Sequence, residues 1–443
     1  MSAGQTGQLG RNRVSRLSER GAVTGKRIVI TSVGSLGDIY PYLALARQLT
    51  QRGHKAIFAT SPYYRSLIEG EGVVFCPVRP DIDLEDRAMI RCIMDPKRGP
   101  ERLIRAYLIP HLRHAYADLS AAVQDAALLV THPITFAAPL VAERYQIPWV
   151  STVLAPMSFF SVYDLPVFPL LPWLARLYRR SPGVSRVLMR VMKWMMRSWT
   201  APIRQLRDEL GLPARGDPVY EGQFSPGLTL ALFSRVLADP QPDWPPHTRV
   251  TGFVFHNEPK APSSRLAQFL DAGPAPLVFT LGSAVVSAAN RFYHESVEAA
   301  QRLGCRAVLL VGTDPQNHPP DPLPEGVLAV PYAPYAHLFP RARAIIHHGG
   351  IGTTAQALRA GRPMLVVPHA FDQPDNAMRV VKLGVARMLS PKRYETKRVA
   401  TELQALTAEP SFAQRALQVE RIVEGESGDQ QAGDAIEAYL AHY

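Results

Sequence analysis

The chain has 443 residues, of which 47% are hydrophobic and 20% charged; these values are typical of a globular protein and argue against extensive disorder. A chain of this length is too long to fold around one ordinary hydrophobic core, so we expect two domains or one large α/β unit. The formal net charge of +11, with a pI of about 9.6, favours an anionic partner, and nucleic acid, an anionic membrane surface and a phosphorylated small molecule all fit.

The N-terminal 25 residues are polar and basic and lack the apolar core of a signal peptide, so we expect a flexible basic tail at 1–25. The chain contains no apolar run long enough to cross a bilayer. Cys76, Cys92 and Cys305 are odd in number and lie outside any CxxC, which indicates neither a disulfide framework nor a zinc site. A reducing cytoplasm is therefore the expected location.

From residue 26 onward, short β-rich runs alternate with helical patterns. The first series predicts a helix from Tyr40 to Arg52 and strands at 27–33, 55–60, 128–132, 148–153 and 228–233. The second series predicts strands at 276–283, 306–312, 327–332, 344–349 and 364–369. Runs of Val, Ile and Leu without strict alternation indicate strands buried on both faces, as in parallel sheets with crossover helices.

A Pro-rich segment at 238–264 separates the two series and is the expected linker. The sequence thus predicts an α/β chain with two doubly wound domains, at 26–237 and 265–443, which face each other across a cleft. We expect the last helix to pack back on the first domain. Ligands of such domains bind outside the carboxyl ends of the strands.

Each domain opens with a strand that runs into a Gly-containing turn, at Gly34 and Gly37 in the first and at Gly282 in the second. Glycine lets the backbone turn tightly and approach a ligand. Many strand-to-helix turns contain glycine for steric reasons alone, so these turns are weak signals.

The segment HHGGIGTTAQALRAGRPMLVVPHAFDQPDNA, residues 347–377, is more specific. It predicts a tight turn at Gly349, Gly350 and Gly352 and a helix that begins at Thr353 or Thr354. The N-terminus of such a helix suits a phosphate or diphosphate. His348 would add a hydrogen bond, or charge if protonated, to the same anion.

The following strand delivers Asp372 and Gln373 to the rim of the cleft, where their acceptors and donors would bind sugar hydroxyls. The alternative is a Gly-capped strand-helix-strand unit with a buried histidine and an N-cap at Asp375.

The order of these features resembles the donor-binding signature of family 1 glycosyltransferases with the GT-B fold. DWPPHTRVTGF, LVFTLGS and HHGGIGTT are similar to the bacterial branch that includes glycopeptide, sterol and rhamnolipid glycosyltransferases. The resemblance implies two Rossmann-like domains, the first for the acceptor and the second for a nucleotide-diphosphate sugar.

The resemblance also implies roles for single residues in donor binding. Tyr332 would stack on the nucleobase, and Gln356 stands where plant relatives place a ribose-binding Glu, which leaves UDP or dTDP open. Asp372 and Gln373 would contact the sugar. The diphosphate would lie at Gly282, Ser283, His348, Gly350, Gly352 and Thr353.

Acceptor activation would come from Asp38, which stands where the bacterial branch carries an Asp and plant members a catalytic His. A carboxylate there would take the proton from the acceptor hydroxyl, and the sugar would be transferred with inversion. The alternative is that Asp38 only caps the following helix. His132 stands where many members place an assisting Asp, so we expect either a swapped pair with Asp38 or a satisfied polar residue at the edge of the cleft.

Asp81 and Asp83 have the Asp-x-Asp spacing with which glycosyltransferases of the other major fold hold a divalent ion. They lie far from the phosphate turn in sequence, so we expect a solvated loop, no metal site and activity that survives EDTA. Apart from the donor, no cofactor is expected.

Residues 165–210 are bulky and basic. Arg186, Arg190, Lys193 and Arg197 recur at helical spacing among Val187, Leu188, Val191, Met192, Met195 and Met196, near Trp194 and Trp199. This pattern suits a hydrophobic acceptor, peripheral contact with an anionic membrane, or an ordinary core helix with a solvated face.

The resulting functional prediction is an inverting hexosyltransferase that uses a nucleotide sugar and a hydrophobic small-molecule or lipid acceptor. A nucleotide-sugar epimerase of the same fold and a non-catalytic nucleotide-sugar-binding protein remain as alternatives. Nucleic acid is not an expected partner, because the sequence contains no recognised nucleic-acid-binding module.

Overall fold

The structure is a computed structural model that describes residues 25–83, 86–167, 182–257, 261–319 and 322–443. Residues 1–24 of the expected tail and residues 168–181 of the bulky, basic segment lie outside these ranges.

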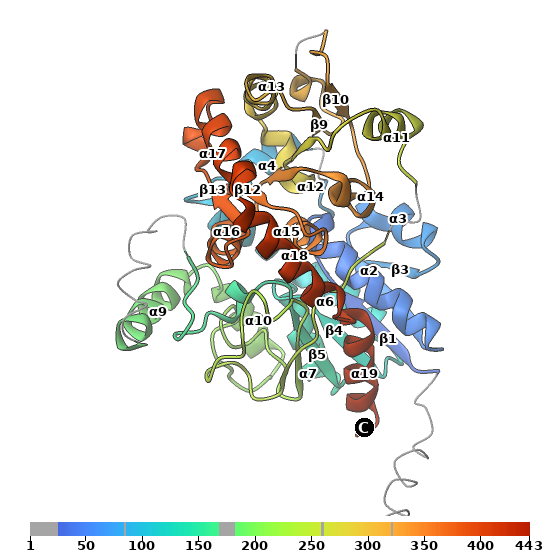
Figure 1. The fold of residues 1–443 in the computed structure, drawn as a ribbon. Coiled ribbons are helices and arrows are strands. Elements are labelled where there is room, and N and C mark those ends of the chain that lie inside the picture. The colour runs from blue at the N-terminus through green and yellow to red at the C-terminus, as the bar shows by residue number, and fades with distance from the viewer. Residues whose placement is uncertain (1–24, 84–85, 168–181, 258–260, 320–321) are drawn as a thin grey trace, which may run out of the picture.

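Two parallel sheets, each with helices on both faces, confirm the predicted α/β fold with two doubly wound units (Figure 1). The first sheet has strand order β3-β2-β1-β4-β5-β6-β7, and the second has β10-β9-β8-β11-β12-β13. The strands of the first are β1 (Arg27–Thr31), β2 (Lys55–Thr60), β3 (Val74–Pro77), β4 (Leu128–Thr131), β5 (Trp149–Val153), β6 (Leu228–Ala231) and β7 (Thr248–Val250). Those of the second are β8 (Leu277–Thr280), β9 (Ala307–Leu310), β10 (Val327–Val330), β11 (Ala344–His347), β12 (Met364–Val366) and β13 (Ala386–Met388).

The central strands are apolar throughout because helices cover both faces of each sheet. Ile28, Val29 and Ile30 in β1 are fully buried, as are Ile345 and Ile346 in β11. Three strands were not predicted from the sequence: β3, β7 and β13, which are short and only partly buried edge strands. Such strands lack the continuous apolar run that marks the central ones. β7 lies within the range 238–264 that was assigned to the linker, and it pairs with β6.

The helices of the first unit are α2 (Leu36–Gln51), α3 (Arg65–Gly70), α4 (Arg87–Ile93), α5 (Gly99–Arg102), α6 (Leu112–Ala122), α7 (Ala137–Arg144), α9 (Pro182–Met196) and α10 (Ala201–Glu209). Those that follow are α11 (Ser264–Asp271), α12 (Gly282–Val285), α13 (Phe292–Arg302), α14 (Tyr335–Leu338), α15 (Ile351–Arg359), α16 (Gln373–Lys382), α17 (Thr396–Ala408), α18 (Pro410–Glu424) and α19 (Gly428–Leu440).

Two helices begin earlier than predicted. α2 begins at Leu36 rather than Tyr40, because Ser35 and Asp38 form a capping box at its N-terminus. α15 begins at Ile351 rather than Thr353, with Gly350 as N-cap. Asp38 and Gly352 therefore lie in the first turn of their helices.

The C-terminal helix α19 crosses back to the first sheet and packs against α2 (Figure 1). Ile436 and Leu440 join the core that contains Ile39 and Leu43. At the rim, the Arg52 guanidinium binds the carboxylates of Asp434 and Glu437, at 2.6 and 2.9 Å. The last helix thus ties the C-terminal half of the chain to the N-terminal unit.

Candidate active site

Asp38 is held in a defined orientation at the N-terminus of α2. Its Oδ2 accepts hydrogen bonds from the backbone N–H of Ser35, at 2.8 Å, and from the Ser35 hydroxyl, at 3.1 Å. A Cβ on Gly34, which has φ of +139°, would lie 2.3 Å from this oxygen. A larger residue at position 34 would therefore clash with the Asp38 carboxylate, which accounts for the glycine there. The helix-capping alternative is present in the structure, and it uses Oδ2.

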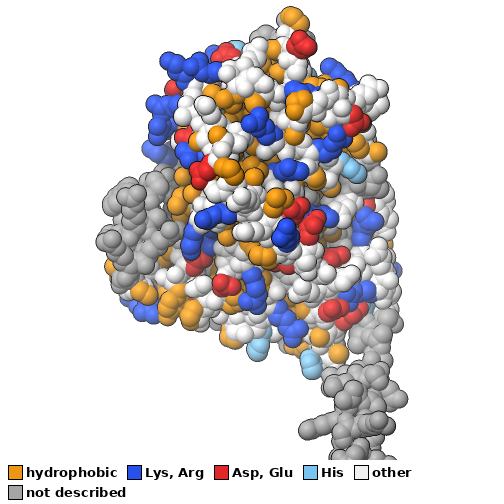
Figure 2. All heavy atoms as spheres, viewed as in Figure 1, with side chains coloured by type: hydrophobic (Ala, Val, Ile, Leu, Met, Phe, Trp, Pro, Cys, Tyr) orange, Lys and Arg blue, Asp and Glu red, His pale blue; other side chains and the backbone are white. Residues whose placement is uncertain are grey.

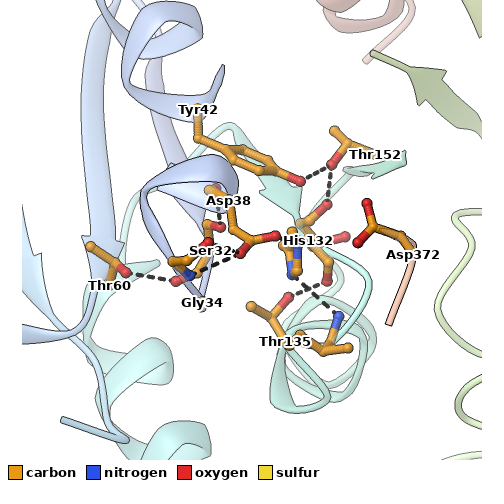
Figure 3. Close-up of polar contacts among 12 residues, drawn as sticks. Ser32, Gly34, Asp38, Tyr42, Thr60, His132, Thr135, Thr152 and Asp372 are labelled. Carbon is orange, nitrogen blue, oxygen red and sulfur yellow. Dashed lines mark hydrogen bonds and ion pairs between the residues drawn. The ribbon is translucent and has the colours of Figure 1, made fainter. Parts of the chain in front are cut away.

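The other carboxylate oxygen of Asp38 faces His132, which follows β4. The Nε2 atom of His132 lies 3.5 Å from Asp38 Oδ1 (Figure 3). The His132 Nδ1 atom accepts a hydrogen bond from the backbone N–H of Ile134, at 3.4 Å, which leaves Nε2 as the ring nitrogen that faces Asp38.

Tyr42 supports the His132 ring from the side. The two rings meet edge to face, with centroids 5.7 Å apart. The Tyr42 hydroxyl contacts the Thr152 hydroxyl, which in turn donates to the carbonyl of Thr131 at 2.8 Å (Figure 3). The structure thus brings Asp38 and His132 together, and their roles in catalysis stay a prediction.

On the second sheet, the imidazole of His348 lies between two glycines. A Cβ on Gly282 would lie 2.5 Å from its Cε1 atom, and a Cβ on Gly350 would lie 2.4 Å from its Nε2 atom. Both glycines therefore make room for this ring, a steric role that the sequence analysis did not foresee.

Burial sets the charge of His348. The lack of water around the ring holds the pKa of His348 well below its ordinary value, and His347 and His369 lower it further. Burial therefore favours the neutral ring at neutral pH, and the contact of His348 with a diphosphate stays a prediction. The Nδ1 atom of His348 is buried and has no hydrogen-bond partner among the described residues.

The N-terminus of α15 lies at the boundary between the two units. Gly350 is its N-cap, and Gly352 and Thr353 follow in the first turn, where backbone N–H groups have no helical acceptor. A Cβ on Gly352 would lie 3.4 Å from the Cα atom of Gly37 in α2. The N-termini of α15 and α2 therefore approach each other closely, one from each sheet.

Asp372 is the N-cap of α16 and faces the side of Asp38 and His132 (Figure 3). Its Oδ2 accepts a hydrogen bond from Asn376, at 2.6 Å, and Asn376 also donates to the carbonyl of Gly349, at 3.0 Å. Desolvation, followed by the negative charge of Asp38, raises the pKa of Asp372 to about 7. The two carboxyl groups, one from each unit, thus interact electrostatically across the boundary.

Gln373 is buried, and its side chain holds the loop before α16. The Oε1 atom accepts hydrogen bonds from the backbone N–H groups of His369 and Ala370, at 2.8 and 3.1 Å. Its carbonyl is therefore occupied, and only its amide N–H groups are left for a sugar.

The other predicted donor residues lie along the second sheet. Ser283 is in α12, which follows β8, and Tyr332 follows β10 with 48% of its surface exposed. Gln356 is partly buried in the second turn of α15. Ser283 and Tyr332 therefore follow the carboxyl ends of β8 and β10, which β9 separates in the sheet, and the α15 turn follows β11, the other neighbour of β8.

Asp375 is not the N-cap of α16, contrary to the alternative interpretation of this segment. It lies inside the helix, where its carboxylate accepts hydrogen bonds from the backbone N–H of Val167, at 3.0 Å, and from Arg379, at 2.7 Å. The cap is Asp372, because the helix begins at Gln373.

Two residues of the site were missed from the sequence, Ser35 and Asn376, whereas Gly34 was predicted only as a turn glycine. The spacing Ser35-x-x-Asp38 matches a capping box, and Asn376 follows Asp372 by one helical turn. The sequence therefore contains a signal for both contacts. The contact between Gly34 and Asp38 had no such signal, since it depends on the backbone conformation.

Asp81 has structural partners. Its Oδ1 accepts hydrogen bonds from the Ser61 hydroxyl, at 2.9 Å, and from the backbone N–H of Tyr63, at 3.3 Å. Across the described ranges, no three His, Cys, Asp or Glu side chains are arranged to hold a metal ion.

Two family models match the chain. Residues 28–163 match the glycosyltransferase family 28 N-terminal domain, and residues 307–427 match the C-terminal domain of erythromycin biosynthesis protein CIII-like proteins.

Relatives and solved structures extend the match over most of the chain. O-mycaminosyltylonolide 6-deoxyallosyltransferase of Streptomyces fradiae is 30% identical over 426 residues, which is 93% of this chain and 97% of the relative. Sterol 3-beta-glucosyltransferase of Leptosphaeria maculans is 28% identical over 81% of this chain, which spans only 25% of that relative.

Two solved structures share the fold. The glycotransferase of kitacinnamycin has a TM-score of 0.71 at 21% identity and covers 94% of this chain and 99% of its own. The glycosyltransferase VinC in complex with DTDP has a TM-score of 0.66 at 22% identity, with the same coverage. Together with the 30% identity to a relative matched over almost its whole length, these findings show that the chain belongs to the family 1 glycosyltransferases with the GT-B fold.

Proposed function

We propose that the protein transfers a hexose from a nucleotide-diphosphate sugar, UDP-glucose or a dTDP-sugar, to a hydroxyl of a hydrophobic small molecule or lipid, with inversion and with Asp38 as general base. One observation carries the proposal. The carboxylate of Asp38, in the first turn of α2, lies where Gly37 meets Gly352 in the first turn of α15. A base from one unit and an anion-binding helix terminus from the other thus meet at one boundary.

The two oxygens of Asp38 have different tasks in this proposal. Oδ2 is held by Ser35 and fixes the carboxylate, whereas Oδ1 takes the proton of the acceptor hydroxyl as that oxygen attacks the anomeric carbon. The Nε2 atom of His132 lies 3.5 Å from Oδ1, where the ring would help to orient this oxygen toward the acceptor. Since a single displacement breaks the bond between sugar and diphosphate, the configuration inverts.

The leaving diphosphate would be received by the first turn of α15 at Gly350, Gly352 and Thr353. Its N–H groups and helix dipole favour the negative charge that develops there. The neutral ring of His348 would add a hydrogen bond. Asp372 and the amide N–H groups of Gln373 would contact the sugar, with Tyr332 at the base, Gln356 at the ribose and Gly282 and Ser283 at the phosphates.

The relatives support the substrate classes. The Streptomyces fradiae relative is named for transfer of a 6-deoxy sugar to a tylonolide, and the Leptosphaeria maculans relative for transfer of glucose to a sterol. The VinC structure contains DTDP. Hydrophobic polycyclic or macrocyclic alcohols and a UDP- or dTDP-sugar are therefore the substrates to test first.

We infer that transfer needs no metal ion, because the terminus of α15 would stabilise the charge of the diphosphate in place of a cation. Asp81, the first residue of the Asp-x-Asp spacing, is already bound by Ser61 and Tyr63. Transfer should continue in EDTA.

The test incubates the purified protein with UDP-glucose, dTDP-rhamnose and other nucleotide sugars, with and without a panel of sterols, macrolide aglycones and phenols, in EDTA and in Mg²⁺. Mass spectrometry identifies products, and NMR determines their anomeric configuration. The proposal predicts acceptor-dependent addition of one sugar with inverted configuration. Conversion of the nucleotide sugar without an acceptor would instead support an epimerase, and retained configuration would refute the single displacement.

A further inference from the structure

Helix α9 presents an apolar face to solvent. Trp194 and Val187 are 75% and 59% exposed, and Val184, Val191 and Met195 on the same face are exposed as well. Ser185 and Met189 are buried on the opposite face, which packs on the first unit. A contiguous apolar stripe on an exposed helix is uncommon at the surface of a soluble domain and indicates an interaction surface.

Positive charge flanks this apolar stripe. The α9 sequence, PGVSRVLMRVMKWMM, contains no Asp or Glu. Arg186 and Arg190 are exposed on the neighbouring face of the helix, and Arg197 is exposed just after its end. Lys193 binds Glu221, so it contributes less net charge than the arginines. An apolar stripe beside a basic one is the pattern of helices that lie in the interface of an anionic bilayer.

A second group of basic side chains lies on the same edge of the molecule. Arg302, Arg393 and Lys397 line a hollow beside α17. In the view of Figure 2, Lys and Arg gather at this upper part of the left edge, and α9 lies at its lower part (Figures 1 and 2). Basic charge on both parts of one edge, in a chain of net charge +11, disfavours contact with a second copy and favours an anionic surface.

The α9 surface also adjoins the boundary between the two units. Arg186 donates a hydrogen bond to the Tyr163 hydroxyl, at 3.3 Å. The next residue, Asp164, pairs with Arg379 of α16 at 2.7 Å. Residues 163 and 164 thus link α9 to α16 of the second unit through side-chain contacts. A bilayer bound at α9 would therefore lie near the boundary between the two units.

We propose that the exposed face of α9, formed by Val184, Val187, Val191, Trp194 and Met195 and flanked by Arg186, Arg190 and Arg197, docks the protein on the surface of an anionic lipid bilayer. The apolar side chains enter the boundary between headgroups and acyl chains, and the arginines bind lipid phosphates. This inference does not depend on the proposed glycosyl transfer, because vesicle binding is measured without a sugar donor.

The experiment sediments the full chain with phosphatidylcholine vesicles that contain or lack phosphatidylglycerol. We expect binding only to the anionic vesicles, with weaker binding as salt is raised. The double variant Arg186→Gln and Arg190→Gln should bind about fivefold to twenty-five-fold more weakly, because each basic side chain near the surface contributes about fivefold. Trp194→Asp with Val191→Asp should reduce binding by at least about tenfold through loss of the apolar contact.

Ile422→Asp is the matched control, since Ile422 is 54% exposed on α18, away from α9. It should bind like the unaltered protein, and circular dichroism should show that all variants are folded. Equal binding of the α9 variants and the control, or equal binding to neutral and anionic vesicles, would overturn the proposal. So would a size-exclusion result in which Trp194→Asp dissociates an oligomer but leaves vesicle binding unchanged.

Discussion

At the scale of single residues, the Asp38 carboxylate uses one oxygen to cap α2, and its other oxygen faces His132. Oδ2 completes the capping box with Ser35, and Oδ1 lies 3.5 Å from His132. From the sequence alone, helix capping and base catalysis are alternative roles for Asp38. The geometry makes them compatible, because the bond that caps α2 also aims the second oxygen.

Replacing His132 tests whether it supports this carboxylate. His132→Ala removes the ring that lies beside Asp38 Oδ1, so we expect kcat for transfer to fall about tenfold or more and the pH dependence of kcat to change. The KM for the donor should stay the same, since His132 lies on the first unit. Unchanged turnover together with an unchanged pH profile would show that His132 is only a satisfied polar residue.

The raised pKa of Asp372 predicts that the free energy of unfolding depends on pH. The Asp372 carboxyl keeps its proton in the native state up to about pH 7, whereas a carboxyl in the unfolded chain loses its proton near ~4. Between these values the native state binds more protons, so the free energy of unfolding contributed by Asp372 falls as the pH rises. Above about pH 7 the loss is complete.

Asp372→Asn keeps a good N-cap residue and removes this titration. Thermal unfolding of both proteins across this range should show the Asn variant gaining stability relative to the unaltered protein as pH rises, with a constant difference above neutrality. A difference in Tm that does not vary with pH would contradict the shift.

At the scale of elements, the side chains that pack against a turn determine where the turn needs glycine. Gly282 has φ of +63° and lies against the His348 ring, whereas Gly304 has φ of +59° and has nothing within 4 Å of its missing Cβ. Alanine variants at these two positions therefore separate the cost of a left-handed backbone conformation from the cost of a steric clash with His348. Gly304→Ala should lower the free energy of unfolding by about 1 kcal/mol.

Gly282→Ala should cost more than Gly304→Ala, because the new methyl group must displace the His348 ring. It should also raise the Kd for nucleotide sugar, which Gly304→Ala should not. Denaturant unfolding and calorimetric titration measure the two effects. Equal costs for the two variants, with equal donor affinity, would show that His348 can move freely.

The elements that the sequence analysis predicted well are the ones with continuous apolar runs. β1, β2, β9 and β11 lie within their predicted ranges because each central strand is buried on both faces. Helix starts were predicted too late at α2 and α15, since their N-termini depend on Ser35 and Gly350 rather than on apolar periodicity. The edge strands β3, β7 and β13 were missed because they are short and only partly buried, so they lack a continuous apolar run.

At the scale of the whole molecule, the candidate site lies where the two units meet. Asp38 belongs to the first sheet, and the turn with His348 and Gly350 belongs to the second. α19 ties the two units together through Arg52, Ile436 and Leu440. The motifs predicted each half of the site from sequence, but the approach of Gly37 to Gly352 depends on how the units pack, and no local pattern encodes it.

Asp38→Asn gives the most direct test of the central claim, because asparagine keeps an oxygen to bind Ser35 and cannot take a proton. Turnover should be measured with the best donor and acceptor, and donor binding by calorimetry. We predict a loss of kcat of about a hundredfold to ten-thousandfold with unchanged donor Kd and unchanged Tm. Turnover close to that of the unaltered protein would contradict Asp38 as the base, and a loss explained entirely by weaker donor binding or by unfolding would contradict it as well.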